Sequence, residues 1–554
     1  MPSKTADAEI DVAQQGVLLT DLLAGDGDRV RRTLRGAARE TEVGLDGSQR
    51  QLVVDALIRV VAGAYAHLPL KRAGYASDPV QALVLLRRRC VEMSEAAFHL
   101  ALTGLITDLR DAHTRYRGPS TLRGRVAALP FLVETYGDDD DPSYIVSKVG
   151  GNADIDDASF KEGVHLEWWN GMPMHRAVEL HADRESAGRT DSRRARALES
   201  LTFRALDYGP PPDEHWVVVG YRTARNAARE VRIPWRVLEP GAADASVRPA
   251  STSALHVAAD PARQAVRQAK TLLFAKDAWS AGRKPAAEQA EPFLDVVTAR
   301  TVSTRSGELG YLRLWSFDVG DDDQYLAHVG DLLGALPDRG LIVDLRGNPG
   351  GLVWAAERLL QYFTDAEVTP TRFSLLATPL TREMASSPFN RLELGRWAAS
   401  LDAAVSTGEL YSRPLPLTDP AWCNDLGRRY FGPVVAVVDA NTYSAGDLFA
   451  AGFVDHGIGP LVAVGEATGG GGANVWTDDQ VLDALAPTSA ALEPLPAGAG
   501  FTLSIRRAVR SAAGEGTPIE DAGIAGIRYA MTRDDVRYGN RDLLEFCAAQ
   551  LELG

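Results

Sequence analysis

Apolar residues recur at every third or fourth position between Ser48 and Leu109. The stretches QLVVDALIRVVAGAY and PVQALVLLRRRCVEMSEAAFHLALTGLITDL both follow this spacing, which gathers apolar side chains on one face of a helix. We therefore predict a helical region over residues 48–115. Residues 1–47 are polar apart from one short apolar turn, and we expect a flexible segment there.

The pattern changes to short strands after this region. Residues 116–143 contain RVAALPFLVETYG, and we expect strands that lead into an inserted unit. Residues 144–240 form this unit, with a strand and a helix joined by an Asn-Gly turn in EWWNGMPMHRAVELH and with alternating strands in HWVVVGYRT and AREVRIPWRV. Residues 241–291 are rich in Ala, Pro, Ser and Lys, which indicates a linker or a surface insertion.

Strands and helices alternate over residues 292–554. The apolar runs in GELGYLRLWSF, GLIVDLRG, VVAVVDA and PLVAVGE predict strands, and DQYLAHVGDLLGAL, GLVWAAERLLQYF and AGDLFAAGFVDH predict helices between them. FTLSIRRAV predicts another strand. This order is typical of an α/β fold with a mostly parallel sheet.

Composition narrows the classes of function. The chain has 554 residues, of which 45% are hydrophobic and 24% charged, and its formal net charge is -15. An acidic protein of this ordinary composition is not expected to bind nucleic acid. Its three cysteines, Cys90, Cys423 and Cys547, lie far apart and form no CxxC pair. We find no HExxH motif and no Cys/His cluster with ligand spacing, so we expect no metal and no cofactor.

The N-terminus and the apolar pattern predict a location. The first residues, MPSKTADAEIDVAQQGVLLTDLL, contain no apolar signal core followed by a cleavage site. No apolar stretch is long enough to span a bilayer. We therefore expect a cytoplasmic protein without a membrane partner.

One serine stands where an apolar strand meets a helix. The stretch PVVAVVDANTYSAGDLFAAGF places Ser444 between the two, next to the small residues Ala445 and Gly446. The carboxyl ends of strands in α/β sheets carry functional sites, and the N–H groups at a helix N-terminus favour an oxyanion. Ser444 is therefore either an activated nucleophile or the N-cap of the helix.

A second strand-to-helix turn lies in LIVDLRGNPGGLVWAAERLL, residues 341–360. Gly350 and Gly351 have no Cβ and can bring backbone N–H groups close to a ligand. Two such turns on neighbouring strands can supply the two halves of an oxyanion hole. An ordinary turn would have the same sequence, and the spacing does not match a phosphate-binding GxxxxGK[ST] loop.

DLRGNPGG followed by an apolar strand and YSAGD resembles serine peptidase family 41, the tail-specific or C-terminal-processing proteases and their tricorn-like relatives. The resemblance covers most of residues 95–550. It implies a ClpP/crotonase-like α/β core. It also implies that GVHLEWWNGMPMHRAVE, residues 163–179, belongs to a PDZ-like domain that binds an extended peptide by strand addition.

The family divides by its general base. Tail-specific members have a lysine in a TxGKG-like segment, whereas this chain has Gly471 at the matching place in EATGGGGANVW. Tricorn-like members have a histidine before the PDZ-like domain, and LRDAHTRY supplies His113 there. The resemblance thus implies that His113 is the base for Ser444. A histidine that titrates near neutrality suits proton transfer from a serine hydroxyl.

A triad also needs a carboxylate that orients the histidine. Tricorn-like members take a glutamate from a segment similar to GTPIEDAGI, which implies Glu520. This chain has Gly526 and Ile527 where the family has Pro-Asp, so the adjacent Asp521 remains an alternative. Asp447 is expected to keep a structural role in the first turn of the helix.

The resemblance also implies which groups contact a substrate. The oxyanion hole is expected from the backbone N–H groups of Gly350 or Gly351 and of Ala445. Gly470 and Gly471 belong to a run of four glycines. This run is either a flexible loop or a loop that lines the substrate cleft.

These residues predict a serine endopeptidase that cuts extended or unfolded polypeptides through an acyl-enzyme intermediate. Two alternatives use the same residues: a scaffold of this fold that binds peptide or lipid without catalysis, and an esterase or acyl transferase with the same triad. The expected partner is a polypeptide substrate. Tricorn-like enzymes often assemble, so the resemblance allows a homo-oligomer.

Overall fold

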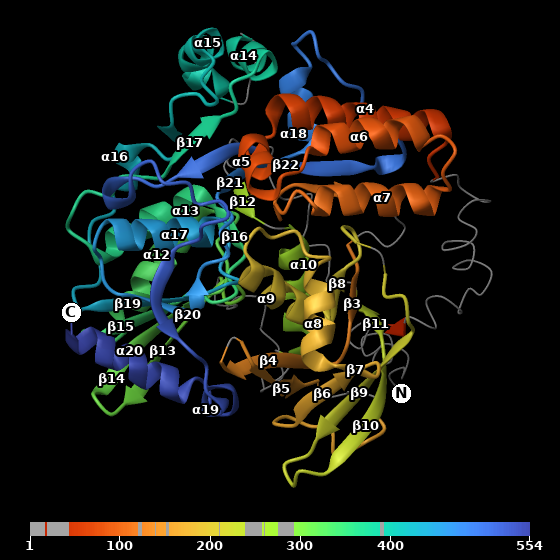
Figure 1. Ribbon diagram of the computed structural model, residues 1–554. Helices are drawn as coiled ribbons and strands as arrows, with labels where there is room; N and C mark the ends of the chain where they lie inside the picture. The colour runs from red at the N-terminus through yellow and green to blue at the C-terminus, as the bar shows by residue number, and fades with distance from the viewer. Residues whose placement is uncertain are drawn as a thin grey trace, which may run out of the picture.

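The computed structural model describes residues 17–18, 44–119, 124–138, 140–150, 155–209, 211–238, 257–259, 261–274, 293–387 and 393–553. The predicted flexible segment 1–47 lies outside these residues except for a two-residue strand and residues 44–47, and most of the predicted linker 241–291 also lies outside them. The chain combines helices with several β-sheets (Figure 1), so the predicted α/β fold is confirmed.

Four helices form the N-terminal region, as the spacing of apolar residues predicts. They are α4 (Gly47–Ala64), α5 (Leu68–Tyr75), α6 (Pro79–Arg89) and α7 (Glu95–Thr107). The carboxylate of Asp46 accepts the N–H of Gln49 at 2.8 Å and caps α4, and Asp78 and Ser94 cap α6 and α7. In Figure 1, α4, α6 and α7 lie side by side next to the strand β22 (Gly500–Val509).

Apolar residues of these helices pack into the main core, for example Val53 and Leu57 of α4 and Leu102 of α7.

No single helix in the described part of the chain is long and apolar enough to cross a membrane. The helices α4 and α5 meet that test only together, as a pair bent by 94°.

A six-stranded sheet forms the centre of the C-terminal half. Its strands lie in the order β13 (Val297–Thr304), β14 (Gly307–Leu314), β15 (Leu341–Asp344), β19 (Val434–Asp439), β20 (Leu461–Ala467) and β23 (Ala525–Tyr529). The pairs β14–β15, β15–β19 and β19–β20 are parallel, and the two outer pairs are antiparallel. The carboxyl ends of the parallel strands therefore meet at one edge, where α/β sheets hold their sites.

Helices cover both faces of this sheet, which explains its apolar runs. One face carries α12 (Asp322–Gly334), α13 (Val353–Leu359) with a 3-10 turn after it (Leu360–Phe363), and α17 (Ala445–Asp455), and the other carries α20 (Arg541–Leu553) (Figure 1). Alternate residues of β15 and β19 divide between two cores. Val343 and Ala436 pack in the first core, and Ile342 and Val435 pack in the core that includes α20.

A second sheet contains the strand that follows His113. Its strands are β2 (Arg115–Arg117), β17 (Arg372–Leu375), β18 (Leu415–Pro416), β21 (Ala473–Thr477) and β22. β22 matches the predicted strand FTLSIRRAV, but it belongs to this sheet and not to the parallel one. Arg115 of β2 is paired with Thr502 of β22, so this short pairing ties the loop of His113 to the C-terminal half.

The inserted unit is an antiparallel sheet with two helices. Its strands lie in the order β10 (Ala228–Pro234), β9 (Trp216–Arg222), β6 (His165–Trp169), β5 (Pro142–Val149) and β4 (Phe131–Gly137), with β7 (Met172–Pro173) beside β6; its helices are α8 (Met174–Ala182) and α9 (Thr190–Ser200). Asn170 and Gly171 have φ values of 50° and 77°, as the predicted Asn-Gly turn requires. Because β4 is an edge strand of this sheet, the unit begins before the predicted boundary at residue 143.

Short pairings join the remaining segments. β1 (Val17–Leu18), β11 (Arg236–Leu238), β3 (Val126–Ala128) and β8 (Phe203–Ala205) form a small sheet, and β12 (Val257–Ala259) pairs with β16 (Gly350–Leu352). The helix α10 (Pro261–Phe274) follows β12, so the predicted linker 241–291 holds a strand and a helix where it is described. The remaining α-helices are α14 (Pro379–Ser386), α15 (Ala398–Thr407), α16 (Pro420–Cys423), α18 (Asp478–Leu485) and α19 (Arg533–Arg537).

Candidate active site

Ser444 lies at the turn between β19 and α17. α17 begins at Ala445, and Ser444 is its N-cap residue. The backbone of Ser444 has φ 64° and ψ -121°, a conformation that non-glycine residues rarely adopt. Strain of this kind persists only where the surrounding structure holds it, and it is common at functional sites.

The turn after β15 holds this conformation. The N–H of Tyr443 donates to the carbonyl of Asn348 at 2.9 Å, and the hydroxyl of Thr442 donates to the carbonyl of Leu345 at 3.0 Å. Asn348 and Leu345 follow β15, which pairs in parallel with β19. The two strand-to-helix turns that the sequence predicts are thus joined directly by hydrogen bonds.

His113 reaches Ser444 from a distant part of the chain. Its Nε2 lies 2.7 Å from Ser444 Oγ, although the two residues are 331 positions apart. Both residues are fully buried, at 0% exposure. An imidazole nitrogen at this distance can accept the hydroxyl proton, which is the contact that an activated serine requires. The structure therefore brings these two predicted residues together.

Contacts of the backbone fix the loop that carries His113. Its N–H donates to Asp111 Oδ1 at 2.8 Å, and its carbonyl accepts the hydroxyl of Thr502, on β22, at 2.7 Å. Asp111 is fully buried and also accepts the hydroxyls of Ser504 at 2.8 Å and Thr114 at 3.0 Å. Asp111 therefore positions the backbone of His113.

The inserted unit packs against this pair. The ring of Tyr443 lies on the ring of His113, with centroids 4.8 Å apart. The guanidinium of Arg196, on α9, lies 4.4 Å from the centroid of the Tyr443 ring. Arg189, which precedes α9, donates to the carbonyl of Ala522 at 2.8 Å. The helix α9 therefore supports the wall of the site next to His113.

Asp447 joins the start of α17 to the glycine run. Its Oδ2 accepts the N–H groups of Ser444 at 2.7 Å and Gly471 at 2.9 Å. Its Oδ1 accepts the N–H of Gly470 at 3.0 Å and the hydroxyl of Thr468. Burial raises the pKa of Asp447 to about 6, although these donors act to lower it. These contacts give Asp447 a structural role.

Gly470 and Gly471 are packed inside the molecule. Both are buried, and their N–H groups are used by Asp447. A Cβ on Gly471 would lie 2.2 Å from the ring of Tyr443, so the missing side chain makes room for that ring. Their contact with a substrate stays a prediction, and the structure gives a different reason for the glycines.

The N–H groups predicted for an oxyanion hole lie on the two turns. Gly350 donates its N–H to Asn348 Oδ1 at 2.9 Å, within its own turn. Gly351 has φ 147°, and a Cβ there would lie 1.9 Å from the backbone carbonyl carbon of Phe317, so only glycine fits. Ala445 is the first residue of α17, and N–H groups of a first helical turn have no acceptor within the helix. Ala445 is therefore the best placed of the three donors, and Gly351, which faces Ala258 of β12, becomes a donor in the proposal below, where a substrate replaces β12.

Glu520 lies buried near the loop of His113. Its Oε2 accepts the N–H of Gly472 at 3.1 Å, and its Oε1 lies 2.7 Å from Lys71 Nζ and 3.6 Å from His67 Nδ1. The same His67 Nδ1 lies 3.3 Å from Asp111 Oδ2. His67 therefore connects two buried carboxylates, one of which holds the His113 loop.

The carboxylates and the cations of this cluster shift each other's pKa values. Burial raises the pKa of Glu520 to about 7, while Lys71 and His67 act to lower it. Burial alone would lower the pKa of His67, but Glu520 and Asp111 raise it overall. Asp521, the alternative carboxylate, is 22% exposed and lies 2.6 Å from Lys71 Nζ. Glu520 is thus the carboxylate on the inner side of the cluster.

No motif in the sequence points to His67 or Lys71. The sequence pattern that could have drawn attention to Lys71 lies in α5. Lys71 follows Leu68 by three residues and shares its buried face. A lysine on the apolar face of a helix requires a buried acidic partner. The sequence does not identify this partner, because Glu520 lies far along the chain.

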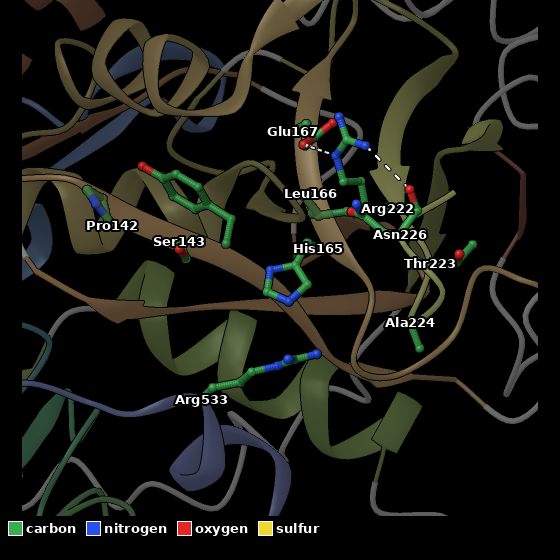
Figure 2. A pocket seen from close by; sticks show the side chains of 11 residues that line it. Pro142, Ser143, His165, Leu166, Glu167, Arg222, Thr223, Ala224, Asn226 and Arg533 are labelled. Carbon is green, nitrogen blue, oxygen red and sulfur yellow. Dashed lines mark hydrogen bonds and ion pairs between the residues drawn. The ribbon is translucent and has the colours of Figure 1, made fainter. Parts of the chain in front are cut away.

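A separate pocket of about 450 Å³ lies in the inserted unit (Figure 2). Its lining includes His165 and Arg222 from the sheet and Arg533 from α19. Figure 2 shows Glu167 and Arg222 joined as an ion pair at its wall. None of the predicted site residues lines this pocket, so it is distinct from the site at Ser444.

One family model matches part of the chain. The sequence model of peptidase family S41 matches residues 308–510. This segment contains Ser444 and both glycine-rich stretches, whereas His113 and Glu520 lie outside it. No curated protein sequence matches the chain.

Solved structures match almost the whole chain. Mature CPAF is 18% identical with a TM-score of 0.64, over 91% of this chain and 98% of that chain. Mature CPAF complexed with lactacystin is 18% identical with a TM-score of 0.63, over 92% of this chain and 99% of that chain. At this identity the likeness shows a shared fold. The tricorn protease is 14% identical over 92% of this chain and 37% of that chain, and its TM-score of 0.38 is too low to carry an argument.

Proposed function

We propose that the chain is a serine-type endopeptidase that cuts extended polypeptides, with Ser444 as nucleophile and His113 as general base. The match of residues 308–510 to the sequence model of peptidase family S41 supports this proposal. The observation that carries this proposal is the 2.7 Å contact between His113 Nε2 and Ser444 Oγ. Ser444 forms a capping box with Asp447 at the start of α17, but an N-cap needs no basic group at its Oγ. Here the hydroxyl faces an imidazole nitrogen that can take its proton.

The proposed reaction has two halves. Ser444 Oγ attacks the scissile carbonyl carbon while its proton moves to His113 Nε2, and the N–H groups of Ala445 and Gly351 stabilise the oxyanion. The C–N bond then breaks as His113 passes the proton to the leaving amine, and an acyl-enzyme on Ser444 remains. In the second half, His113 takes a proton from water, the hydroxide attacks the acyl carbon, and Ser444 Oγ leaves with that proton.

Glu520 is the third member of the triad in this proposal. It is buried, and His67 connects it to Asp111 in the loop that carries His113. A carboxylate in this place stabilises the imidazolium that forms when Ser444 attacks. The exposure of Asp521 makes it less suited to that task.

The pairing of β16 supports an extended substrate. β12 runs antiparallel to β16, with Ala258 opposite Gly351. The edge of β16 next to the proposed oxyanion donors therefore accepts an extended segment of chain. We propose that a substrate adds to this edge as a strand in place of β12. The inserted unit, which is PDZ-like in this proposal, holds a further part of the peptide.

A fluorophosphonate probe tests the activated serine. We expect labelling of the parent protein, no labelling of Ser444→Ala, and a rate about 10²- to 10⁴-fold lower in His113→Ala. His456→Ala is the matched control, because His456 lies at the far end of α17, where its Nε2 accepts the N–H of Thr369 at 2.8 Å. A folded parent that is not labelled would contradict the proposal, and labelling that survives His113→Ala would show that another group is the base.

Two substrates separate a peptidase from an esterase. We expect cleavage of unfolded casein at internal bonds and slower turnover of a small p-nitrophenyl ester. Turnover of the ester alone would favour an esterase or acyl transferase, and binding of casein without cleavage would favour a non-catalytic scaffold. Lactacystin gives a further test, since it is bound in a structure of mature CPAF. We expect lactacystin to reduce the labelling of Ser444.

The proposal also includes the branch of the family and the type of core. Gly471 stands where tail-specific members have their lysine, which favours the tricorn-like branch with a histidine base. The parallel strands β14, β15, β19 and β20 fit a ClpP/crotonase-like core. The cytoplasmic location and the homo-oligomer stay predictions.

A further inference from the structure

A buried cation joins the helix α5 to the proposed catalytic carboxylate. Lys71 is 1% exposed, and its Nζ lies 2.7 Å from Glu520 Oε1 and 2.6 Å from Asp521 Oδ1. The same ammonium donates to the carbonyl of Arg110 at 2.8 Å. The hydrogen bonds of this ammonium go to Asp521 and Arg110, and Glu520 Oε1 faces it as an ion-pair partner without a hydrogen bond. A lysine is almost never buried to this degree unless it is paired.

Two cations face two fully buried carboxylates in this cluster. His67 Nδ1 lies 3.3 Å from Asp111 Oδ2 and 3.6 Å from Glu520 Oε1, and all of these side chains are at most 1% exposed. Like charges repel strongly where water is excluded. Asp111 and Glu520 can therefore both stay ionised only while Lys71 and His67 balance them.

We propose that Lys71 and His67 are positioning residues of the catalytic centre, which keep Glu520 ionised and fixed beside the loop of His113. The N-terminal helical region is then part of the peptidase machinery rather than a cover over it. This inference rests on the proposed function, in which Glu520 completes the triad with His113 and Ser444. It assigns a task to two residues that lie more than 200 positions before the segment matched by the family model.

Other titratable groups surround the cluster: Tyr65, Tyr75, Tyr443, His113 and Asp521. The nearby arginines act on this outer layer, Arg193 on Tyr75 and Asp521 and Arg196 on Tyr443. Burial raises the pKa of Tyr65, Tyr75 and Tyr443, so these phenols stay neutral near pH 7. Asp521 is acidic, and the ring of His113 faces Ser444 Oγ.

A metal ion is a weaker explanation of the same cluster. His67, Asp111 and Glu520 offer ligand atoms that lie within 4.8 Å of one another. The ammonium of Lys71 already lies 2.7 Å from Glu520 and supplies the positive charge on that side. A cation there would be repelled by Lys71.

The test is the pH dependence of fluorophosphonate labelling in a double-mutant cycle. The variants are Lys71→Met, Lys71→Arg, Glu520→Gln and the double variant Lys71→Met/Glu520→Gln. A nearby cation lowers the pKa of a carboxyl group by about 1 to 3 units. We therefore expect Lys71→Met to label about tenfold or more slowly at pH 7 and to regain most of its rate near pH 9, because its acid limb moves to higher pH. Lys71→Arg keeps the charge and is expected to retain most of the rate.

The double variant separates a positioning role from a general structural one. If Lys71 acts through Glu520, Lys71→Met changes the rate less than about twofold in the Glu520→Gln background. His67→Gln is an independent test. We expect it to lower the labelling rate at pH 7 in the parent and to have no such effect in the Glu520→Gln variant. Lys161→Met, at an exposed position of the inserted unit, is the matched control and is expected to behave as the parent.

Each outcome decides the proposal. A labelled parent together with an unchanged pH profile in Lys71→Met overturns the role of Lys71 and leaves the proposed function intact. An equal loss at every pH, present also in the Glu520→Gln background, overturns it as well. A folded parent that is not labelled overturns the proposed function and this inference with it. If Lys71→Met does not fold, the His67→Gln pair gives the same decision.

Discussion

Two buried carboxylates lie near the Ser444–His113 pair, Asp447 at the turn of Ser444 and Glu520 near the loop of His113, and they have different hydrogen-bonding partners. Asp447 accepts only neutral donors, three backbone N–H groups and one hydroxyl. Glu520 accepts one backbone N–H and lies beside the charged Lys71 and His67. Burial raises both pKa values, to about 6 and about 7. A raised pKa therefore does not identify a catalytic group, and the partners of the carboxylate do.

This contrast assigns the two acids different tasks. Neutral donors hold a carboxylate in one place and give shape to the backbone around it. Charged partners instead decide whether the carboxylate is ionised. The contacts show that Asp447 braces the strained turn of Ser444, whereas Glu520 is the acid whose charge matters in the proposed reaction.

The sharpest test of the contrast is Glu520→Gln. The amide keeps an oxygen for the N–H of Gly472 but removes the negative charge. We expect the labelling rate to fall about 10²- to 10⁴-fold, because the imidazolium loses its stabilising charge. Glu515→Gln, at an exposed glutamate, serves as the control. A labelling rate equal to that of the parent would remove Glu520 from the triad.

The reverse pattern is expected for Asp447→Ala. The substitution leaves the buried N–H groups of Ser444, Gly470 and Gly471 without their acceptor. Each unsatisfied group costs about 1–3 kcal/mol, so we expect the free energy of unfolding to fall by about 3–5 kcal/mol in total. Urea denaturation measures this loss. A loss below about 1 kcal/mol would mean that the turn of Ser444 is held by other contacts.

The sequence predicts the Asp447 side of the site better than the Glu520 side. An apolar strand, small residues and an amphipathic helix lie consecutively around Ser444, so local patterns suffice to place the turn. The meeting of this turn with Asn348 follows from the parallel order of β15 and β19. The resemblance to a family motif led to the prediction of His113, whose loop is fixed by the pairing of β2 with β22.

The Glu520 side depends on contacts between distant segments. Tertiary packing brings Lys71 and Glu520 together, and no periodicity in the sequence predicts that contact. The strand β22 shows the same limit, since alternation predicts a strand but not the sheet that it joins. The helix α10 was missed because its Ala- and Lys-rich surroundings resemble a linker, although these residues also favour helices.

A pH profile of stability isolates the burial of Asp447. Its pKa in the folded state is about 6, above the ordinary value of 3.8. Between these values the folded state binds more protons than the unfolded state, so this contribution to stability is lost as the pH rises from about 4 to about 6. A shift of about 2 units corresponds to about 3 kcal/mol. We expect Asp447→Asn to lose less stability than the parent over this range in urea denaturation. Parallel profiles for the two proteins would contradict the raised pKa.

A smaller effect is expected on the glycine run. In Gly471→Ala the new Cβ would lie 2.2 Å from the ring of Tyr443, and such overpacking costs about 1–3 kcal/mol. Because Tyr443 packs on His113, we also expect slower labelling. Gly408→Ala is the control: its φ of 82° gives backbone strain, but nothing lies within 4 Å of its Cβ position. We expect Gly408→Ala to lower the thermal midpoint slightly without any effect on labelling. If Gly471→Ala and Gly408→Ala were labelled at the same rate, the packing of Tyr443 on His113 would not affect the reactivity of Ser444.

The smallest effect is expected one residue away from Lys71. Arg72 lies on the same helix and pairs with Asp78 at 2.8 Å, but the two side chains are 42% and 50% exposed. Exposed ion pairs contribute about 0.2–1 kcal/mol, so we expect Arg72→Met to change the free energy of unfolding by at most about 0.5 kcal/mol and to leave the pH profile of labelling as in the parent. Lys71→Met, measured beside it, is expected to shift that profile. If both variants shift it alike, the effect comes from the charge of α5 as a whole, and burial beside Glu520 is not what gives Lys71 its role.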